Sequence, residues 1–182
     1  MKEKKQGLVL WFTGIPSSGK TTLANHVAEA FNQKGLEVEV LDSDDIRQEL
    51  SPDLGFTPKD RDLSTKRIVW IANLLAKHGV SVMISSGASS RNHRERARHL
   101  IANFAFVYVK CPVDVCISRG GLYAKVKKGE FSGRLGEAKT IEEIYKPYQE
   151  PINPEITVDT SLLSIKESVK LVMSELKSLN LI

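Results

Sequence analysis

Residues 14–21 read G-I-P-S-S-G-K-T and match the phosphate-binding pattern G-x-x-x-x-G-K-[ST] at every fixed position. The run just before them, residues 8–12, is continuously apolar, which is typical of a strand buried on both faces of a parallel sheet. After the loop, apolar side chains recur at helical spacing at Leu23, Val27, Ala30 and Phe31. A strand, a glycine-rich loop and a helix in this order predict a P-loop at the end of a strand in an α/β sheet.

The predicted loop supplies groups that attract negative charge. Its glycines let backbone N–H groups wrap phosphates, and the following helix directs its positive N-terminus at them. We expect Lys20 to reach the β and γ oxygens of ATP and Thr21 to ligate magnesium. The predicted ATP-binding residues of this segment are Gly14, Ser17, Ser18, Gly19, Lys20, Thr21 and Thr22. The alternative, a purely structural glycine-rich turn, does not account for the strand and helix around it.

The rest of the chain continues the alternation of strands and helices. Further strands are predicted at 38–41, 80–84, 104–109 and 156–158, and further helices at 68–78, 94–101 and 165–179. This order predicts an α/β fold of the P-loop NTPase type, with a doubly wound, mainly parallel sheet of five strands and helices on both faces. Residues 120–154 lack a strand pattern and are too long for an ordinary connection, so we interpret them as a mobile lid.

Length and composition fit one kinase domain that spans residues 1–182, with 41% apolar and 26% charged residues. The apolar runs are too short for a membrane span or a signal-peptide core. Cys111 and Cys116 have no partners at zinc-like spacing and make no disulfide framework. We therefore expect a soluble, cytoplasmic protein with no membrane partner.

The charge balance does not require a nucleic-acid partner. The formal net charge is +4, but the basic residues are scattered and are matched by 22 acidic ones. A phosphate-rich small ligand explains the excess equally well. The basic cluster of Lys125, Lys127 and Lys128 is either a solvated helix face or a set of phosphate contacts.

A second group of polar residues, D-S-D-D-I-R at 42–47, follows the second predicted strand. Carboxyl ends of neighbouring strands meet at one crevice, which brings these acids close to the P-loop. Asp44 is a candidate acceptor for the proton of an attacking hydroxyl, and Asp42 is a candidate ligand of magnesium or its waters. Arg47 can clamp an anionic acceptor. An acidic helix N-terminus, with Asp44 or Asp45 as a cap, is the alternative reading.

At these residues the chain resembles the adenylylsulfate (APS) kinases, which phosphorylate the 3′-hydroxyl of adenosine 5′-phosphosulfate (APS). The family pattern D-G-D-N-x-R is similar to residues 42–47, and L-G-F-S-x-x-D-R is similar to residues 54–61. The similarity extends over almost the whole chain, including 111–123 and 148–155. The resemblance implies ATP and Mg²⁺ as cofactors, catalysis by Asp44 and Lys20, and a role in sulfate assimilation. It leaves open whether the protein forms a homodimer.

The resemblance also implies the residues that hold a small, nucleotide-like acceptor, and several of them depart from the family pattern. Ser64 stands where the family has asparagine, and S-F-I-S-P-Y-R is shortened to residues 86–91. Arg134 replaces a phenylalanine that stacks on the adenine, and R-D-P-K is shortened to R-G at 119–120. Arg119 is expected at the ATP phosphates. The implied acceptor-binding residues are Asp42, Arg47, Phe56, Arg61, Ser64, Ser89, Lys125 and Arg134.

These departures keep two alternatives open beside phosphorylation of APS. One is a kinase of the same build with a different nucleotide-type acceptor, for example a cytidine phosphoramidate. The other is a non-catalytic nucleotide-binding module, against which the presence of Lys20, Thr21 and Asp44 argues, because binding alone needs no positioned proton acceptor. Trp11 and Trp70 lie on apolar patterns, and we expect both in the core.

Overall fold

The protein is described here from a computed structural model, which covers residues 6–88, 90–129 and 140–182. At its centre lies a five-stranded parallel sheet in the order β2-β3-β1-β4-β5. The strands are β1 (Val9–Thr13), β2 (Val38–Asp42), β3 (Ser81–Ser85), β4 (Phe104–Lys110) and β5 (Ile156–Asp159). The strand that feeds the P-loop, β1, is the middle one and pairs with β3 on one side and β4 on the other. The predicted five strands and their parallel arrangement are confirmed.

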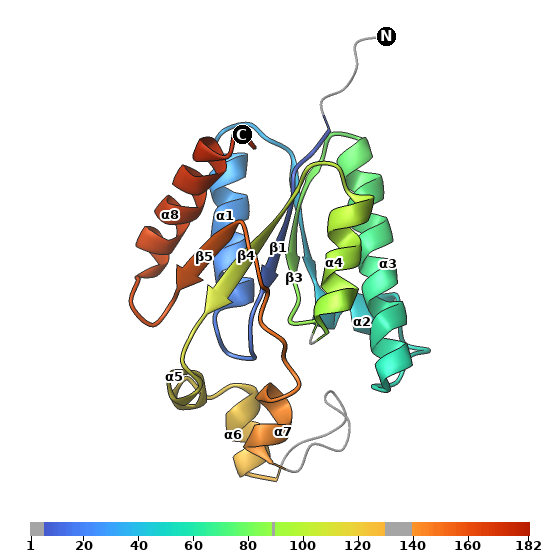
Figure 1. Cartoon of the computed structure of the whole chain (residues 1–182), viewed down its shortest axis with the longest axis vertical. Helices are drawn as coiled ribbons and strands as arrows, with labels where there is room; N and C mark the ends of the chain where they lie inside the picture. Colours follow the sequence, from blue (N-terminus) through green and yellow to red (C-terminus); the bar gives the residue numbers. More distant parts are fainter. Residues whose placement is uncertain (1–5, 89, 130–139) are drawn as a thin grey trace.

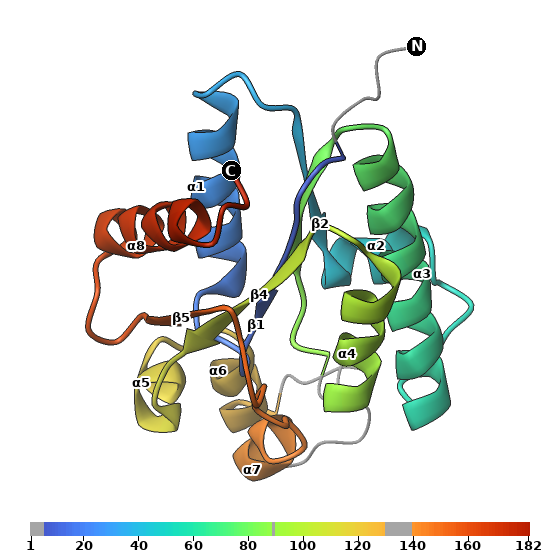
Figure 2. The ribbon, with the colours of Figure 1, turned by 45° about the horizontal axis from the view of Figure 1, so that its top comes forward.

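Helices cover both faces of this sheet, as predicted. The helices of the described residues are α1 (Lys20–Asn32), α2 (Ser43–Glu49), α3 (Pro58–Lys77), α4 (Arg91–Leu100), α5 (Val113–Ser118), α6 (Leu122–Lys127), α7 (Ile141–Tyr145) and α8 (Ile165–Ser178). Figures 1 and 2 show α1 and α8 on one face and α3 and α4 on the other. None of the helices in the described ranges is long and apolar enough to cross a membrane.

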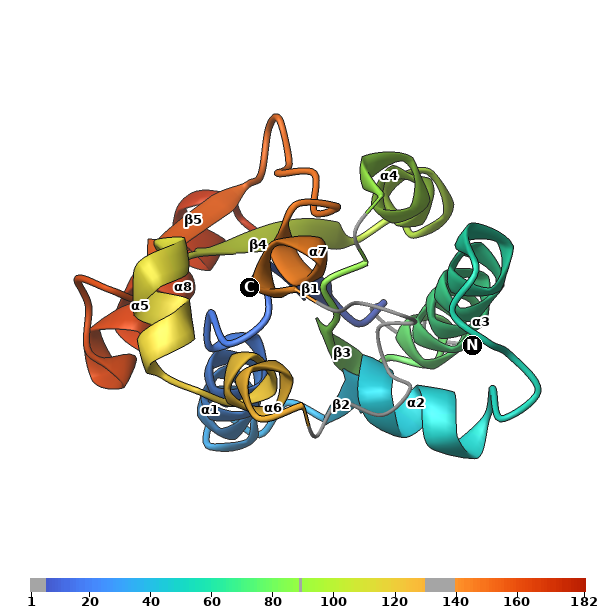
Figure 3. The same cartoon turned by 90° about the horizontal axis from the view of Figure 1, so that it is seen from below.

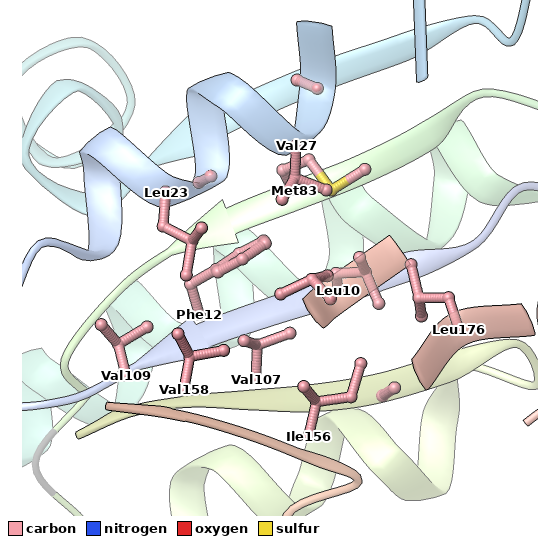
Figure 4. Close-up of a cluster of buried hydrophobic side chains, with 14 of the residues drawn as sticks. Leu10, Phe12, Leu23, Val27, Met83, Val107, Val109, Ile156, Val158 and Leu176 are labelled. Carbon is pink, nitrogen blue, oxygen red and sulfur yellow. The ribbon is translucent and has the colours of Figure 1, made fainter. Parts of the chain in front are cut away.

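The alternation of side chains along β1 divides the core into two layers. Leu10 and Phe12 point toward α1 and α8, where they join Leu23, Val27 and Leu176 in one buried cluster (Figure 4). Because this central strand has helices on both faces, every one of its residues is buried, which explains the continuous apolar run in the sequence. Burial of such side chains is the main force that holds the P-loop's supporting strand in place.

Trp11 points to the opposite face, where it packs beside Phe106 and under α3 and α4. Its indole Nε1 donates a hydrogen bond of 2.9 Å to the carbonyl oxygen of Ser86, at the start of the loop after β3. The core position expected for Trp11 is therefore confirmed. Trp70 is different: it is 66% exposed, and the expectation of a core position was wrong. On α3, Ile68, Val69 and Ala72 form the buried stripe, and Trp70 lies outside it.

The segment between β4 and β5 contains short helices where the sequence showed only the absence of strands. The helices α5, α6 and α7 lie beyond the carboxyl end of the sheet (Figure 1), and in the end-on view of Figure 3 α6 lies in front of α1 and α7 lies in front of β1 and β4. Their buried side chains form a separate small cluster, made of Cys111, Cys116, Tyr123 and Ile144. This cluster lies over the carboxyl edge of the sheet, outside the two main core layers. We call the stretch of chain between β4 and β5, which contains α5, α6 and α7, the cap segment.

Candidate active site

The loop between β1 and α1 is held close to the sheet by a glycine contact. A Cβ atom on Gly14 would lie 2.4 Å from the carbonyl oxygen of Val109, so only glycine fits there. Gly19 has a φ of 97°, in the left-handed region that glycine adopts without strain. Ser18 is fully buried, and its hydroxyl has no hydrogen-bond partner among the described residues.

Lys20 occupies the first position of α1, where its side chain is partly buried and lines both pockets described below. Burial lowers the pKa of Lys20 to about 8, and the negative charges of Asp42 and Asp44 oppose this shift in part. The Nζ atom donates a hydrogen bond of 2.9 Å to the carbonyl oxygen of Ile15 within the loop. A desolvated ammonium group held in this way is stabilised by an anion bound to the loop.

Three oxygen-bearing side chains meet where α1, β2 and β3 come together. The hydroxyl of Thr21 donates to Asp42 Oδ2 at 2.8 Å and lies 2.9 Å from the hydroxyl of Ser85. Asp42 is also the N-cap of α2, because its Oδ1 accepts the backbone N–H of Asp44 at 2.8 Å. Hydroxyl and carboxylate oxygens are the ligands that Mg²⁺ prefers, so the donor set fits that ion.

Most of the predicted catalytic and acceptor residues line one cavity of about 690 Å³, which we call the larger pocket. It extends from the P-loop to α2 and α3, and the cap segment covers it with side chains from α6 and α7. Residues that line it include Lys20, Thr21, Asp42, Asp44, Arg47, Arg61, Ser64 and Lys125. Residues from separate parts of the sequence therefore share one cavity beside the P-loop.

Arg47 and Arg61 are arranged around the ring of Phe56. The guanidinium carbon of Arg47 lies 4.7 Å from the ring centroid and that of Arg61 lies 5.7 Å from it. Backbone acceptors fix both side chains: Arg47 Nη1 donates to Gly55 O at 2.6 Å, and Arg61 Nε donates to Phe56 O at 2.9 Å. Burial lowers the pKa of Arg61, and the neighbouring charge of Arg47 lowers it further. Two cations held this close favour an anion between them.

A second cavity of about 540 Å³, the smaller pocket, lies on the other side of the P-loop, against α8. Arg119, which follows α5, is fixed at its edge by hydrogen bonds from Nη2 to Thr160 O at 2.6 Å and from Nη1 to Thr160 Oγ1 at 3.1 Å. Thr160 in turn donates to the carbonyl oxygen of Ser18 at 2.8 Å. The residues that line this pocket are Ser17, Gly19, Lys20, Thr21, Thr22, Leu23, Arg119, Thr160, Leu163, Ile165 and Ser168.

Two residues that shape these pockets, Thr160 and Tyr148, were not among the predicted site residues. Thr160 follows β5, and its place after the carboxyl end of a parallel strand was an available signal. Tyr148 lines the larger pocket, where its hydroxyl lies 3.0 Å from Thr13 Oγ1. The buried Arg94 stacks on the Tyr148 ring at 5.0 Å and donates to the carbonyl oxygen of Ala88, which ties the cap segment to the loop after β3.

Most of the predicted site residues line one of the two pockets, and the exceptions have specific reasons. Phe56 does not line the larger pocket but supports Arg47 and Arg61, which do. Ser18 lines neither pocket, and its side chain is fully buried. Ser89 and Arg134 lie outside the described residues.

Comparisons with known proteins agree over nearly the whole chain. The family model for adenylylsulphate kinase matches residues 6–159. The adenylyl-sulfate kinase of Synechococcus sp. (strain JA-3-3Ab) is 41% identical over 176 residues, or 96% of this chain and 96% of that protein. The adenylyl-sulfate kinase of Rippkaea orientalis (strain PCC 8801 / RF-1) is 39% identical over 178 residues, or 97% of this chain and 94% of that protein.

Solved structures show the same similarity. The Mycobacterium tuberculosis APS kinase CysC, determined in complex with AMPPNP and APS, matches this fold with a TM-score of 0.82 at 34% sequence identity. The match covers 94% of this chain and 98% of that chain.

Proposed function

This chain belongs to the adenylylsulfate kinase family, and on that premise we propose that it transfers the γ-phosphoryl group of ATP to the 3′-hydroxyl of APS. The products of this reaction are ADP and APS that carries a phosphate on its 3′ oxygen. The observation that carries the proposal is the shared lining of the larger pocket, in which Lys20 of the P-loop and Asp44 of α2 face one cavity. Similarity to adenylyl-sulfate kinases over nearly the whole chain supports the same reaction.

Each group has a role that its position supports. We assign the ATP phosphates to the P-loop, where Lys20 and the backbone N–H groups neutralise the charge of the β and γ oxygens. Asp44 accepts the proton of the 3′-hydroxyl as its oxygen bonds to the γ phosphorus and the bond to the β,γ-bridging oxygen breaks. Arg47 and Arg61 hold the anionic phosphosulfate of the acceptor. Arg119, beside the loop, adds positive charge near the phosphates of ATP.

Thr21 and Asp42 are the residues that we assign to a magnesium ion, either directly or through its waters. When bound with ATP, Mg²⁺ neutralises charge on the β and γ oxygens. The 2.8 Å hydrogen bond between the two side chains and the purely oxygen character of the cluster support this assignment.

We propose that residues 120–154 form a lid that closes over the bound nucleotides. Support comes from the described parts of this segment: Gly121, Leu122 and Lys125 of α6 and its preceding turn line the larger pocket, and so do Ile144 and Tyr148. Closure of this segment over both nucleotides would exclude water from the transfer. Lower hydrogen exchange in α6 and α7 when ATP analogue and APS are bound would support closure, and equal exchange would contradict it.

The two alternatives kept open by the sequence are not favoured. Relatives named adenylyl-sulfate kinase match at 39% and 41% identity over 97% and 96% of this chain. Ser64, the substituted asparagine position, still lines the larger pocket as a polar, buried residue. Homodimer formation stays a prediction, which light scattering on the purified protein tests directly.

A screen of acceptors tests the proposed function. ADP release is measured with ATP, Mg²⁺ and APS, and in parallel with a panel of other adenosine, cytidine and uridine derivatives, including a cytidine phosphoramidate. We expect APS to be the preferred acceptor and mass spectrometry to show one added phosphate on it. Preference for a cytidine derivative, or the absence of acceptor-dependent ADP release, would contradict the proposal.

A further inference from the structure

We propose that Arg94, on α4, is a positioning residue for the acceptor. It fixes one part of the lining of the larger pocket, formed by Gly87, Ala88 and Tyr148, which we call the pocket wall. The inference rests on the proposed function, because it takes APS as the occupant of the larger pocket. It deepens that function by giving a role in acceptor binding to a residue outside the motifs of the sequence.

The first observation is the burial of a charged side chain. Arg94 is 1% exposed, and burial lowers the pKa of its guanidinium group. Such a group has five N–H donors, and a charged side chain is rarely buried unless its donors are paired. Burying it costs free energy that an apolar residue of similar size would not cost. A specific role for the guanidinium group accounts for its presence there.

The second observation is what the guanidinium group contacts. Its Nη1 donates hydrogen bonds to the carbonyl oxygens of Gly87, at 3.4 Å, and Ala88, and its Nη2 donates to the carbonyl oxygen of Gln149. The guanidinium carbon lies 5.0 Å from the centroid of the Tyr148 ring. One planar group therefore joins the loop after β3 to the end of the cap segment.

The joined residues belong to the lining of the larger pocket, whereas Arg94 itself does not. Ala88 has a φ of 34°, in the left-handed region that residues other than glycine adopt only with strain, so its surroundings must hold it there. The hydroxyl of Thr13 donates to the carbonyl oxygen of Gly87 at 3.1 Å and lies 3.0 Å from the Tyr148 hydroxyl. Arg94 and Thr13 together fix the backbone and the ring of the pocket wall.

The first turn of α4 holds the end of the cap segment at two further points. The backbone N–H of Arg91 donates to Gln149 Oε1 at 2.9 Å, and Arg91 Nε donates to the carbonyl oxygen of Glu150 at 2.9 Å. The chain is thus fixed directly beside Tyr148. An acceptor that enters the larger pocket meets a wall whose shape is already set, and its binding energy is not spent on ordering that wall.

The alternative is a purely structural role, in which Arg94 only ties α4 to its neighbours. Both explanations predict a lower melting temperature when Arg94 is replaced, so stability does not separate them. Nucleotide binding does. The residues that line the smaller pocket do not include the pocket wall, so loss of Arg94 should weaken the binding of the acceptor and preserve that of ATP.

The experiment compares the wild type with Arg94→Met and Arg94→Lys. Initial rates of ADP release with varied APS and saturating ATP give kcat and the KM for APS, and calorimetric titration gives the Kd for ATP. Arg96→Met, on the same helix, is the matched control, because Arg96 pairs with Asp62 of α3 at 2.7 Å and does not contact the pocket wall.

We expect Arg94→Met to raise the KM for APS by about 10- to 100-fold, because the acceptor must then order the pocket wall itself. Both kcat at saturating APS and the Kd for ATP should stay within about twofold of the wild type. Arg94→Lys keeps the charge but loses the planar fork and the ring contact, so its KM for APS should rise by about 3- to 10-fold.

A folded Arg94→Met variant with the KM of the wild type would overturn this inference alone. Equal weakening of ATP and APS would also overturn it, because it indicates a general loss of structure. If Arg94→Met does not fold, an unchanged KM in Arg94→Lys would overturn the inference in favour of a structural role. A wild type without APS-dependent ADP release would overturn the proposed function, and this inference with it.

Discussion

The hydroxyl of Thr21 donates a 2.8 Å hydrogen bond to Asp42 Oδ2, and this contact joins the P-loop to the start of α2. Asp42→Asn keeps a side-chain oxygen that can cap α2 but removes the negative charge, so stability should change little. We expect the Mg²⁺ concentration for half-maximal activity to rise about 10- to 100-fold, as for loss of a metal-positioning group. Asp45→Asn, an exposed carboxylate on the same helix, is the control. An unchanged magnesium dependence would remove Asp42 from the metal site.

Asp44 lines the larger pocket together with Lys20, which is the arrangement that a proton acceptor needs. Asp44→Asn should lower kcat by about 10² to 10⁴-fold while the affinity for ATP stays nearly constant. Rapid-quench or steady-state kinetics with ATP and APS give both quantities, and Asp45→Asn again serves as the control. If ATP affinity falls and kcat does not, Asp44 belongs with the metal ligands instead.

Lys20 gives a prediction in which stability and function change in opposite directions. Its pKa in the folded protein is about 8, below the ordinary value of 10.5. The charged form of Lys20 therefore lowers the free energy of unfolding at pH values below 8. This destabilisation disappears as the pH rises toward 10.5. Lys20→Met should therefore stabilise the nucleotide-free protein near pH 7 by about 1 to 2 kcal/mol, and much less near pH 10. The same variant should abolish phosphoryl transfer.

Urea unfolding at both pH values measures this effect, with Lys34→Met, an exposed lysine beyond the end of α1, as the control. A variant of Lys20 that is less stable than the wild type near pH 7 would show that the ammonium group stabilises the empty loop. Near-normal kcat in the same variant would contradict the assignment of the P-loop.

Replacement of Phe56 should weaken the binding of the acceptor and leave the binding of ATP almost unchanged. Its ring orders Arg47 and Arg61, and the family resemblance gives it a stacking role on the acceptor's base. Phe56→Ala should raise the KM for APS by about 5- to 150-fold, the range for loss of one stacking partner. Phe56→Trp should recover most of this loss. Steady-state kinetics that show equal effects on the KM values of ATP and APS would argue for a general loss of folding.

Much of the fold could be predicted because the signals were local. The P-loop motif and the apolar run before it indicated a buried strand, and the pairing of β1 on both sides agrees with that reading. Trp70 was placed wrongly because an apolar residue inside a helical pattern was read as buried. The position of each residue around the helix decides burial, and Trp70 lies outside the buried stripe of α3.

The candidate site was harder to predict where it depends on contacts between distant segments. Tyr148 and Thr13 are 135 positions apart in the sequence, and Arg119 and Thr160 are 41 positions apart. Neither contact leaves a periodic or motif signal, because each arises only when the cap segment returns to the carboxyl edge of the sheet. The acids at 42–47 could be predicted because parallel strands place their carboxyl ends at the same edge.

The specificity constant for APS tests the account most directly, because it measures the complete reaction that the two pockets are assigned to perform. It is obtained from initial rates of ADP release with saturating ATP and Mg²⁺ and varied APS, with product identity checked by mass spectrometry. We predict a kcat/KM of about 10⁴ M⁻¹s⁻¹ or above, within the usual range for enzymes on their own substrates. A value some hundredfold lower, together with faster turnover of another nucleotide acceptor in the same assay, would contradict it.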